Sequence, residues 1–500
     1  MLNAHFQSAI ALEGQLFGAH SHFRLAIGER ALSLDGLVTV MLGSLLLVLF
    51  RKRFLLAGIA VSWGMSGTLW AQESLLTDRL PEQSVSGLQS LLERAMTQSS
   101  SIQIRDLVEE NYEGRGLVSE SGKQMKLGSS LSYRKEQDLE ADDSDIRDRV
   151  YYSLTLSKAL YHWGALEANK EKGELSLRME ELKTFEAYRN LALDVRRRYL
   201  NILIARKDIE LSEKNLELYR SQLEQAEERF KSGTASTVQV HALSLSVNKS
   251  ELDVLRKENG FQDQVDYLAR LVGMKSSEIE QDFVGGVPKR DSLETEEIQS
   301  LENYFDGGVD RSSSIEQSSK AVEYYEKDLH IANQRRKPKI GMSIGLTQYD
   351  LDSRGARRPE EIVYGGVSIS WSIFDGAATR GYKKSAIAQL EEMNAQFEDA
   401  KSTYRFNLER AQRLLDLNAR VLKRDETALE LSERHVAEAT KDFEEGRVTF
   451  DVLGNTQKNF MTQDLQTNRS RAAYLNSLAE MASLLGFDPF AQKFIASRTE

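Results

Sequence analysis

The chain contains no cysteine and only five prolines among its 500 residues. The absence of cysteine excludes disulfide bonds, thiolate metal ligands and a cysteine nucleophile. The prolines leave residues 83–287 and 360–488 without a single one. Because proline removes a helix donor and clashes with the preceding turn, two proline-free tracts of this size permit very long helices.

An excess of basic residues is also missing. The net charge is −11, and 28% of the residues are charged. A nucleic-acid-binding protein usually carries a clustered basic face, so no nucleic-acid partner is expected. The high charged content suits helices surrounded by water.

Two apolar stretches, residues 37–50 and 54–71, flank a basic cluster near the N-terminus. The first is too short to span a bilayer comfortably. The second follows three basic residues and ends at Ala71, and this order of basic, apolar and small residues is typical of a secretory signal. We therefore predict that residues 1–71 are an N-terminal extension with a signal peptide and that the mature chain is exported. A retained membrane anchor is the alternative.

The sequence repeats itself at a constant offset of 213 residues. Repeats of this kind indicate a duplicated structural unit. The matching pairs include Ser99 and Ser312, Lys126 and Lys339, Tyr151 and Tyr364, Phe230 and Phe443, and Gly273 and Gly486. The predicted division is an N-terminal segment 72–98, a first repeat 99–280, a connector 281–311, a second repeat 312–487 and a C-terminal tail 488–500.

Each repeat contains two short segments in which apolar residues alternate with Ser, Thr or Gly. This period of two is typical of a strand with one wet face. Small hydroxyl side chains on that face suit a strand with lipid on one side and a wet lumen on the other, although half-buried strands of a soluble sheet are the alternative. The four segments are 127–133, 152–157, 340–347 and 367–373, and the charged segments 134–149 and 348–361 between them are predicted surface loops.

Aromatic residues follow the second predicted strand of each repeat. Tyr161 and Trp163 follow it in the first repeat, and Trp371 and Phe374 lie at the corresponding place in the second. Aromatic residues are enriched where a membrane meets water. We therefore predict that these four side chains mark such a boundary.

The second part of each repeat has an apolar residue at every seventh position. A strict seven-residue repeat favours coiled-coil packing, and small residues at the companion positions would let helices approach closely. An isolated coiled coil would explain this pattern but not the strands. The series are Tyr188, Val195, Ile202, Ile209, Leu216, Leu223 and Phe230, and Leu408, Leu415, Leu422, Leu429, Val436 and Phe443.

A glycine ends each of these long helical patterns. Gly233 and Gly446 lie at the same place in the two repeats, and a tight reversal there needs the positive φ that glycine adopts without steric cost. The first helix, over 162–231, would be about 100 Å long, and a second helix would return beside it. Each repeat is thus predicted to be a strand hairpin fused to a helical hairpin.

Four strands per chain are too few to cross a membrane alone. Open sheet edges leave backbone groups unpaired in lipid, and about eight strands are the practical minimum for a closed barrel. Three copies would pool twelve strands and leave room for a lumen. The predicted fold class is therefore mainly α with a small transmembrane β-barrel, in which a trimer forms a 12-strand β-barrel and a 12-helix α-barrel tunnel.

On these features the sequence resembles the TolC-like outer-membrane efflux proteins, also called outer membrane factors, over residues 86–487. The second hairpin turn is similar to the family's tip motif, in which an aromatic residue, a glycine and a threonine precede Asp-Val-Leu. Here these residues are Phe443, Gly446, Thr449, Asp451, Val452 and Leu453. The resemblance implies a homotrimeric channel in the outer membrane, in contact with its lipid, whose helical tunnel in the periplasm docks onto a periplasmic adaptor (membrane fusion protein) and an inner-membrane pump or ABC transporter.

The candidate functional residues then lie at the hairpin tips. Asp451 and Arg447 would ring the periplasmic entrance of a trimer as a gate, since rings of charged side chains can select ions and close an entrance. Solvated turn residues are the alternative. The turns themselves are the expected adaptor-docking sites, at Gly233, Thr234, Gly446 and Thr449.

The sequence offers no catalytic or metal-binding pattern. Gly341, Ser343 and Gly345 match a nucleophile elbow, but that elbow requires a strand-to-helix turn and the serine lies inside an alternating segment. The histidines of the mature chain lack metal-ligand spacing. We predict no enzyme and no cofactor, but a conduit for small-molecule efflux or type I secretion of proteins. The alternatives are a periplasmic adaptor and a non-conducting coiled-coil envelope protein.

Overall fold

The computed structural model describes residues 76–136, 147–279, 283, 286–349, 360–490 and 492–493. The chain divides into two compact units, Met1–Leu69 and Trp70–Glu500, and all described residues belong to the second. The predicted signal peptide therefore lies outside the described residues, as do the central parts of the two predicted surface loops.

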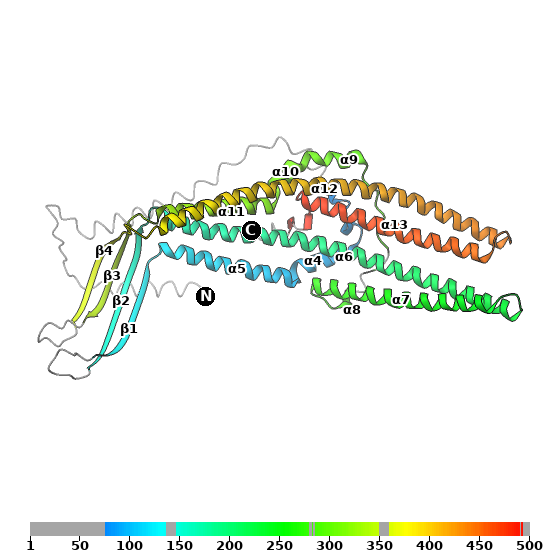
Figure 1. Ribbon diagram of the computed structural model, residues 1–500, viewed down its shortest axis with the longest axis horizontal. Coiled ribbons are helices and arrows are strands. Elements are labelled where there is room, and N and C mark those ends of the chain that lie inside the picture. The colour runs from blue at the N-terminus through cyan, green and yellow to red at the C-terminus, as the bar shows by residue number, and fades with distance from the viewer. Residues whose placement is uncertain are drawn as a thin grey trace, which may run out of the picture. The chain divides into compact units, whose positions relative to one another are not determined.

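Two helices of 67 residues each dominate the second unit, α6 (Ala165–Lys231) and α12 (Ala378–Glu444). Each is followed by a shorter helix that returns beside it, α7 (Thr237–Val272) and α13 (Phe450–Leu484) (Figure 1). The two helical hairpins expected from the heptads are therefore present. No helix in the described part of the chain is both long and apolar enough to cross a membrane.

The heptad residues are buried in only part of each long helix. Ile202 and Leu415 are fully buried, whereas Phe230 and Phe443, at the tips, are exposed. Ala226 and Ala439 remain buried close to the tips, as expected for small residues that let two helices approach closely. The coiled-coil pattern thus packs within one chain in the middle of the hairpins and leaves apolar side chains free near their ends.

A helix precedes each strand pair, and the sequence analysis missed both. They are α5 (Ser100–Glu120) and α11 (Ser313–Gln334), which pack along α6 and, for α11, also along α12. A strand hairpin fused directly to a helical hairpin is therefore an incomplete description. The signal was hidden because the apolar residues of α5 are spread around the helix instead of forming one stripe; Ile104, Leu107, Leu117 and Val118 are accordingly exposed.

The four strands form one antiparallel sheet in the order β1-β2-β3-β4. They are β1 (Lys126–Glu136), β2 (Arg147–Tyr161), β3 (Lys339–Tyr349) and β4 (Glu360–Ser370). The elements of the second half begin 213 residues after their counterparts, as β1 and β3 do. β1 and β4 are the open edges of this sheet.

The long helices form a wall with two edges. α6 contacts α5, α7, α11 and α13, and α12 contacts α11 and α13, but neither α5 nor α7 packs extensively against α12. α5 and α11 lie on the strand side of the wall, and α7 and α13 lie on the tip side (Figure 1). On the strand side, the order of the helices across the wall is therefore α5, α6, α11 and α12. On the tip side, the order is α7, α6, α13 and α12. The lateral edges of the wall are therefore α12 on one side and α5 and α7 on the other.

Short elements pack against the middle of the wall. They are η1 (Pro81–Gln83), α4 (Ser86–Gln98), α8 (Ser276–Ile279), α9 (Thr295–Ser300), η4 (Leu301–Tyr304) and α10 (Phe305–Arg311). The main hydrophobic core lies here, where leucines of α4 meet Val195 and Tyr199 of α6.

One fully buried arginine joins the two ends of the described chain to this core. Arg196 of α6 donates bidentate hydrogen bonds to Glu82 at 2.6 and 3.0 Å and to Asp488 at 2.6 and 3.1 Å. Burial alone would lower the pKa of Arg196, but the carboxylates of Asp488 and Glu82 outweigh it and hold the pKa above its ordinary value. Glu82, Arg196 and Asp488 are all buried, so the charged group is paired as a buried charge must be.

Candidate functional site

The sheet has one apolar face. Leu127 of β1 faces Leu156 of β2, Leu154 faces Leu346 of β3, and Met342 faces Val367 of β4. Large side chains on this face are strongly exposed, with Leu131 and Val363 each at 75%. An exposed apolar surface of this kind marks a membrane or protein contact.

Hydroxyl groups and glycines occupy the opposite face. Ser130 and Ser153 are hydrogen-bonded at 2.8 Å, and the hydroxyls of Thr155 and Tyr364 at 3.1 Å. Gly345 lies directly between these last two residues, and a Cβ there would come within 2.7 Å of the Tyr364 ring. The lack of a side chain at Gly345 therefore lets the tyrosine ring lie flat on the sheet.

Each pair of strands joins its long helix through the same tight turn. The amide of Ala165 donates to the carbonyl of His162 at 3.0 Å, and that of Ala378 to Asp375 at 3.2 Å. The two central residues of each turn have positive φ: 55° and 77° at Trp163 and Gly164, and 62° and 71° at Gly376 and Ala377. Both junctions are thus type I′ turns, each with one non-glycine residue in the left-handed region.

The predicted boundary aromatics gather at these junctions. The indole of Trp163 donates to the carbonyl of Pro338 at 2.7 Å, and that of Trp371 donates to Arg336 at 2.9 Å. Tyr161 packs edge-on against Trp163 with ring centroids 5.0 Å apart, and Phe374 is 83% exposed. All four lie at the end of the sheet where it meets the helices, with both indoles fixed on the α11–β3 turn.

The two hairpin tips reverse the chain in the same way. Gly233 and Gly446 have φ values of 76° and 73°, and the residue after each glycine donates its amide to a carbonyl five residues earlier, at 2.8 Å for Thr234 and 2.7 Å for Arg447. These bonds satisfy carbonyls at the helix end. The first tip restarts at Ser236, whose hydroxyl caps α7, whereas Thr449 begins α13 without a side-chain cap.

The predicted gate residues do not form an ion pair with each other within the described chain. Arg447 pairs with Asp442 in the last turn of α12 at 3.1 Å and with Glu445 directly after that helix. Asp451 is exposed in the first turn of α13. A gate role for either residue stays a prediction.

The tips differ in their aromatic residues. Phe443 and Phe450 close the second tip with ring centroids 5.9 Å apart. In the first tip Thr237 stands in place of Phe450, and Phe230 is 47% exposed. The two adaptor-docking turns expected from the sequence therefore share a backbone but present different surfaces.

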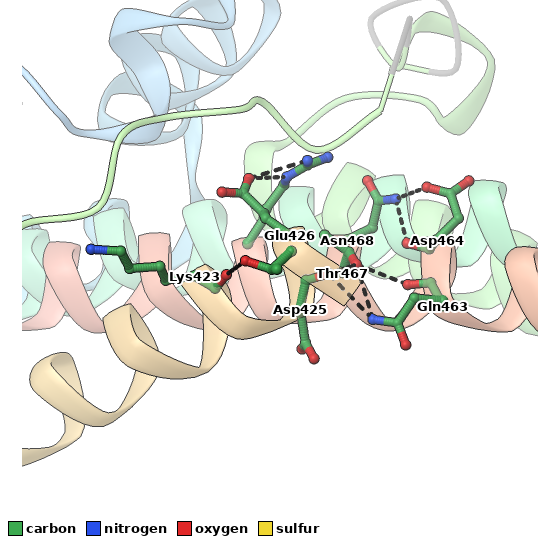
Figure 2. A network of polar contacts seen from close by, with 9 residues as sticks. Lys423, Asp425, Glu426, Gln463, Asp464, Thr467 and Asn468 are labelled. Atoms are coloured by element: carbon green, nitrogen blue, oxygen red, sulfur yellow. Dashed lines mark hydrogen bonds and ion pairs between the residues drawn. The ribbon is translucent and has the colours of Figure 1, made fainter. Parts of the chain in front are cut away.

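A polar network joins α12 and α13 in the middle of the second hairpin, and the sequence analysis did not identify it. Figure 2 shows Gln463 and Thr467 donating to the backbone carbonyl of Asp425, at 3.3 and 3.2 Å, beside the ion pair of Glu426. Thr467 is fully buried. The signal for this network in the sequence was a polar residue, Thr467, inside a helix of a coiled coil, where buried positions are normally apolar.

Ion pairs also connect the two hairpins to each other. Lys207 of α6 pairs with Asp464 of α13 at 3.2 Å. Asp208 accepts from Lys257 of its own hairpin at 2.8 Å and from Arg469 of the other at 3.3 Å. The two repeats are therefore held together by charge on the tip side of the wall.

The motif around Ser343 does not have the geometry of a nucleophile elbow. Ser343 lies within β3, paired with Ser157 and Gly366 on the neighbouring strands, so the motif around it is not a strand-to-helix elbow. Among the described residues, no group of three or more His, Cys, Asp or Glu side chains could hold a metal ion.

Known proteins share this arrangement. A family model described as outer membrane efflux protein matches residues 124–274. The chain is similar to the CmeC outer membrane channel of Campylobacter jejuni, with 13% identity and a TM-score of 0.68 over 86% of this chain and 90% of that one. The chain has the fold of an outer membrane channel. It is also similar to the outer membrane protein VceC of Vibrio cholerae, with 17% identity and a TM-score of 0.62 over 80% of this chain and 98% of that one.

These matches bear on two predictions. The resemblance to outer membrane efflux proteins and the mainly α fold class with four strands are confirmed. The family model is described as an efflux protein and the CmeC structure as a channel. No curated protein sequence matches the chain.

Proposed function

We propose that the protein is the outer-membrane channel of a tripartite efflux or type I secretion system, through which small molecules or secreted proteins leave the cell. The observation that carries this function is the open four-stranded sheet with one apolar and one hydroxyl-rich face, continued by long helices on one side only. In an outer membrane, the apolar face contacts lipid and the hydroxyl face lines a wet lumen.

The two open edges of the sheet can be paired only with strands of further copies of the chain. β1 and β4 each leave a row of backbone donors and acceptors unpaired, which lipid does not satisfy. Pairing β4 of one copy with β1 of the next satisfies both edges, and such a head-to-tail contact closes into a ring. We infer a homotrimer with twelve pooled strands.

The helical wall supports the same assembly. Both of its edges carry exposed apolar side chains, which would be costly to leave in water. Packing α12 of one copy against α5 and α7 of the next would cover them in the ring that the strands form. The exposed residues include Ile104, Leu107 and Leu117 on α5, Val238, Leu245, Leu252 and Leu255 on α7, and Ile387, Phe406, Leu417 and Leu431 on α12.

In this assembly the helices form a periplasmic tunnel with the tips at its inner end. The tip turns at Gly233, Thr234, Gly446 and Thr449 would dock a periplasmic adaptor, and Asp451 and Arg447 would surround the entrance. The channel supplies a path and no catalysis, so an inner-membrane pump or ABC transporter would provide the energy. We also propose that residues 99–280 and 312–487 are the duplicated units of this tunnel.

The test is assembly and conduction by the full chain. Extracted from outer membranes in neutral detergent, it should run as a heat-modifiable trimer and produce discrete conductance steps in planar bilayers. A water-soluble monomer that needs no detergent would overturn the proposal. A stable trimer without conductance would instead favour a structural coiled-coil envelope protein.

A further inference from the structure

Seven basic side chains gather where the second strand pair meets its helices. Four lie in and beside the turn between α11 and β3, and three lie in the first turns of α12. We call this group the basic collar: Arg335, Arg336, Lys337, Lys339, Arg380, Lys383 and Lys384. All except the half-buried Lys383 are exposed, in a protein whose net charge is −11.

Contacts hold the two parts of the collar together. Arg335 lies over the ring of Tyr382 in α12 at 3.6 Å, and Arg336 donates to the carbonyl of Ile373 at 2.6 Å. Lys337 lies 4.7 Å from the ring of Trp163. The turn between α11 and β3 is therefore fixed against the start of α12, so that both parts of the collar lie at the same end of the long helix.

The collar is not neutralised within the chain. Across the described residues, none of its seven members forms an ion pair with a carboxylate. Asp375, between the two parts in sequence, accepts from the hydroxyl and amide of Thr379, and these bonds together with the charge of Arg336 lower the pKa of Asp375. This carboxylate is the nearest acidic group in sequence and, within the described part of the chain, forms no ion pair with the collar. Burial and the charge of Lys339 lower the pKa of His162 nearby. Clustered cations without partners are unfavourable unless an anion joins them.

The position of the collar indicates which anion. Val363, Val367 and Ile369 expose apolar side chains along β4, Trp371 and Phe374 follow, and the collar comes next. At a membrane boundary, an apolar band of side chains is followed by aromatic residues and then by cations. Lysine and arginine stems can lie along apolar surface while their charged ends reach phosphate groups.

From this geometry we propose that the basic collar binds the phosphate groups of anionic phospholipid headgroups in the leaflet that faces the helices. This rests on the proposed membrane location of the sheet. Arginine suits such a ligand because its planar fork can donate two parallel hydrogen bonds to one phosphate. The first junction does not offer the same surface. Lys123 pairs with Glu167 and Lys170 with Glu174, and glutamates, Glu167 and Glu171, stand where the collar has Arg380 and Lys384, so Lys126 is the one corresponding cation for which no ion pair is present among the described side chains.

The experiment compares lipids on purified full-length trimers in neutral detergent. Mixed micelles containing dioleoyl phosphatidylglycerol should raise the melting temperature of the trimer, whereas dioleoyl phosphatidylcholine at the same concentration should not. Each cation near an anionic surface strengthens binding about fivefold. The variant R380Q/K383Q/K384Q leaves the α11–β3 turn intact. It should therefore bind phosphatidylglycerol with an affinity on the order of a hundredfold lower and lose the temperature shift.

A matched variant removes four cations far from the junction, at the hairpin tips. R229Q/K231Q/R434Q/K441Q lacks four basic residues that form no ion pair among the described side chains, and it should keep the full shift. A second collar variant, R335Q/K337Q, should lose part of it.

Three outcomes would overturn the proposal. They are an unchanged lipid response in both collar variants, an equal temperature shift from inorganic phosphate alone, and loss of trimers by the collar variants before any lipid is added. The last would show that the cations face a neighbouring copy. Conductance of the unmodified trimer tests the proposed channel separately, so a conducting trimer without lipid preference would refute only the collar.

Discussion

At the β2–α6 junction and at the β4–α12 junction the chain makes the same type I′ turn, yet the side chains around the two turns differ in charge. Seven positions that are all basic in the second repeat correspond, 213 residues earlier, to three lysines, two glutamates, a glycine and a glutamine. Lys123 and Lys170 of the first junction are paired with acids. The two repeats thus share the backbone geometry that the strands and helices require and differ in the charges on its surface.

The two repeats can also be compared at corresponding positions inside the helical wall. Arg196 of α6 corresponds to Glu409 of α12, and Ile202 corresponds to Leu415. The second pair is fully buried in both repeats, whereas Arg196 is buried and Glu409 is exposed. Apolar heptad positions keep their role in both halves because both hairpins pack in the same way, while the polar positions depend on which terminal segments cover them.

The largest expected effect is the loss of stability when Arg196 is replaced, compared with the same replacement of its counterpart Glu409. Replacing Arg196 with Ala leaves Glu82 and Asp488 buried without a cation and should lower the free energy of unfolding by about 3–5 kcal/mol. Replacing Glu409 with Ala removes only an exposed pair with Arg413 at 3.6 Å and should change it by about 0.5 kcal/mol or less. Thermal melts followed by circular dichroism on both trimers check this, and equal losses would contradict the assigned burial.

A smaller loss of stability is expected at Tyr404, whose counterpart in the first repeat is apolar. Tyr404 of α12 corresponds to the buried Leu191 of α6, and its hydroxyl donates to the carbonyls of Gly308 and Leu484. Replacing Tyr404 with Phe should cost about 1–2 kcal/mol at neutral pH because these buried carbonyls lose a donor.

The pH dependence of this variant gives an independent check. Burial raises the pKa of Tyr404 to about 12, above its value in the unfolded chain, so the unfolded state loses its proton first. The stabilisation is complete below about pH 10 and is lost as the pH rises towards 12, by about 2 kcal/mol. The stability difference between the wild type and Tyr404→Phe should therefore shrink over this range in alkaline melts, and a constant difference would refute the assignment.

The last comparison is between the two tips, where the loss of stability should be no larger than at Tyr404. A β-branched side chain at φ 73° costs about 1–2 kcal/mol, so Gly446→Val should distort the second tip and impair export while trimers stay intact. Gly233→Val is the matched change at the first tip, where φ is 76°. Export assays beside trimer gels check both, and unchanged export in the two variants would count against a role for the tips.

Much of this fold could be predicted because its signals are periodic. Alternation in segments such as 340–347 indicated strands, and heptads such as that through Leu415 indicated long helices. α5 was missed because its apolar residues do not recur at the spacing of one helix face. The Arg196 cluster was missed because its carboxylates lie 114 and 292 residues away in sequence, and no local pattern links such groups. Asp451 and Arg447 remain predictions, since their proposed role depends on neighbouring copies.

The Arg196 cluster has a consequence for the order in which the chain matures. Glu82 comes from the beginning of the described chain and Asp488 from its end. Until residue 488 has been synthesised, the guanidinium has only one of its two carboxylates. Docking of the C-terminal segment is therefore a late step, and a chain truncated before Asp488 should be recognised as unfinished by proteases that attack loosely packed termini.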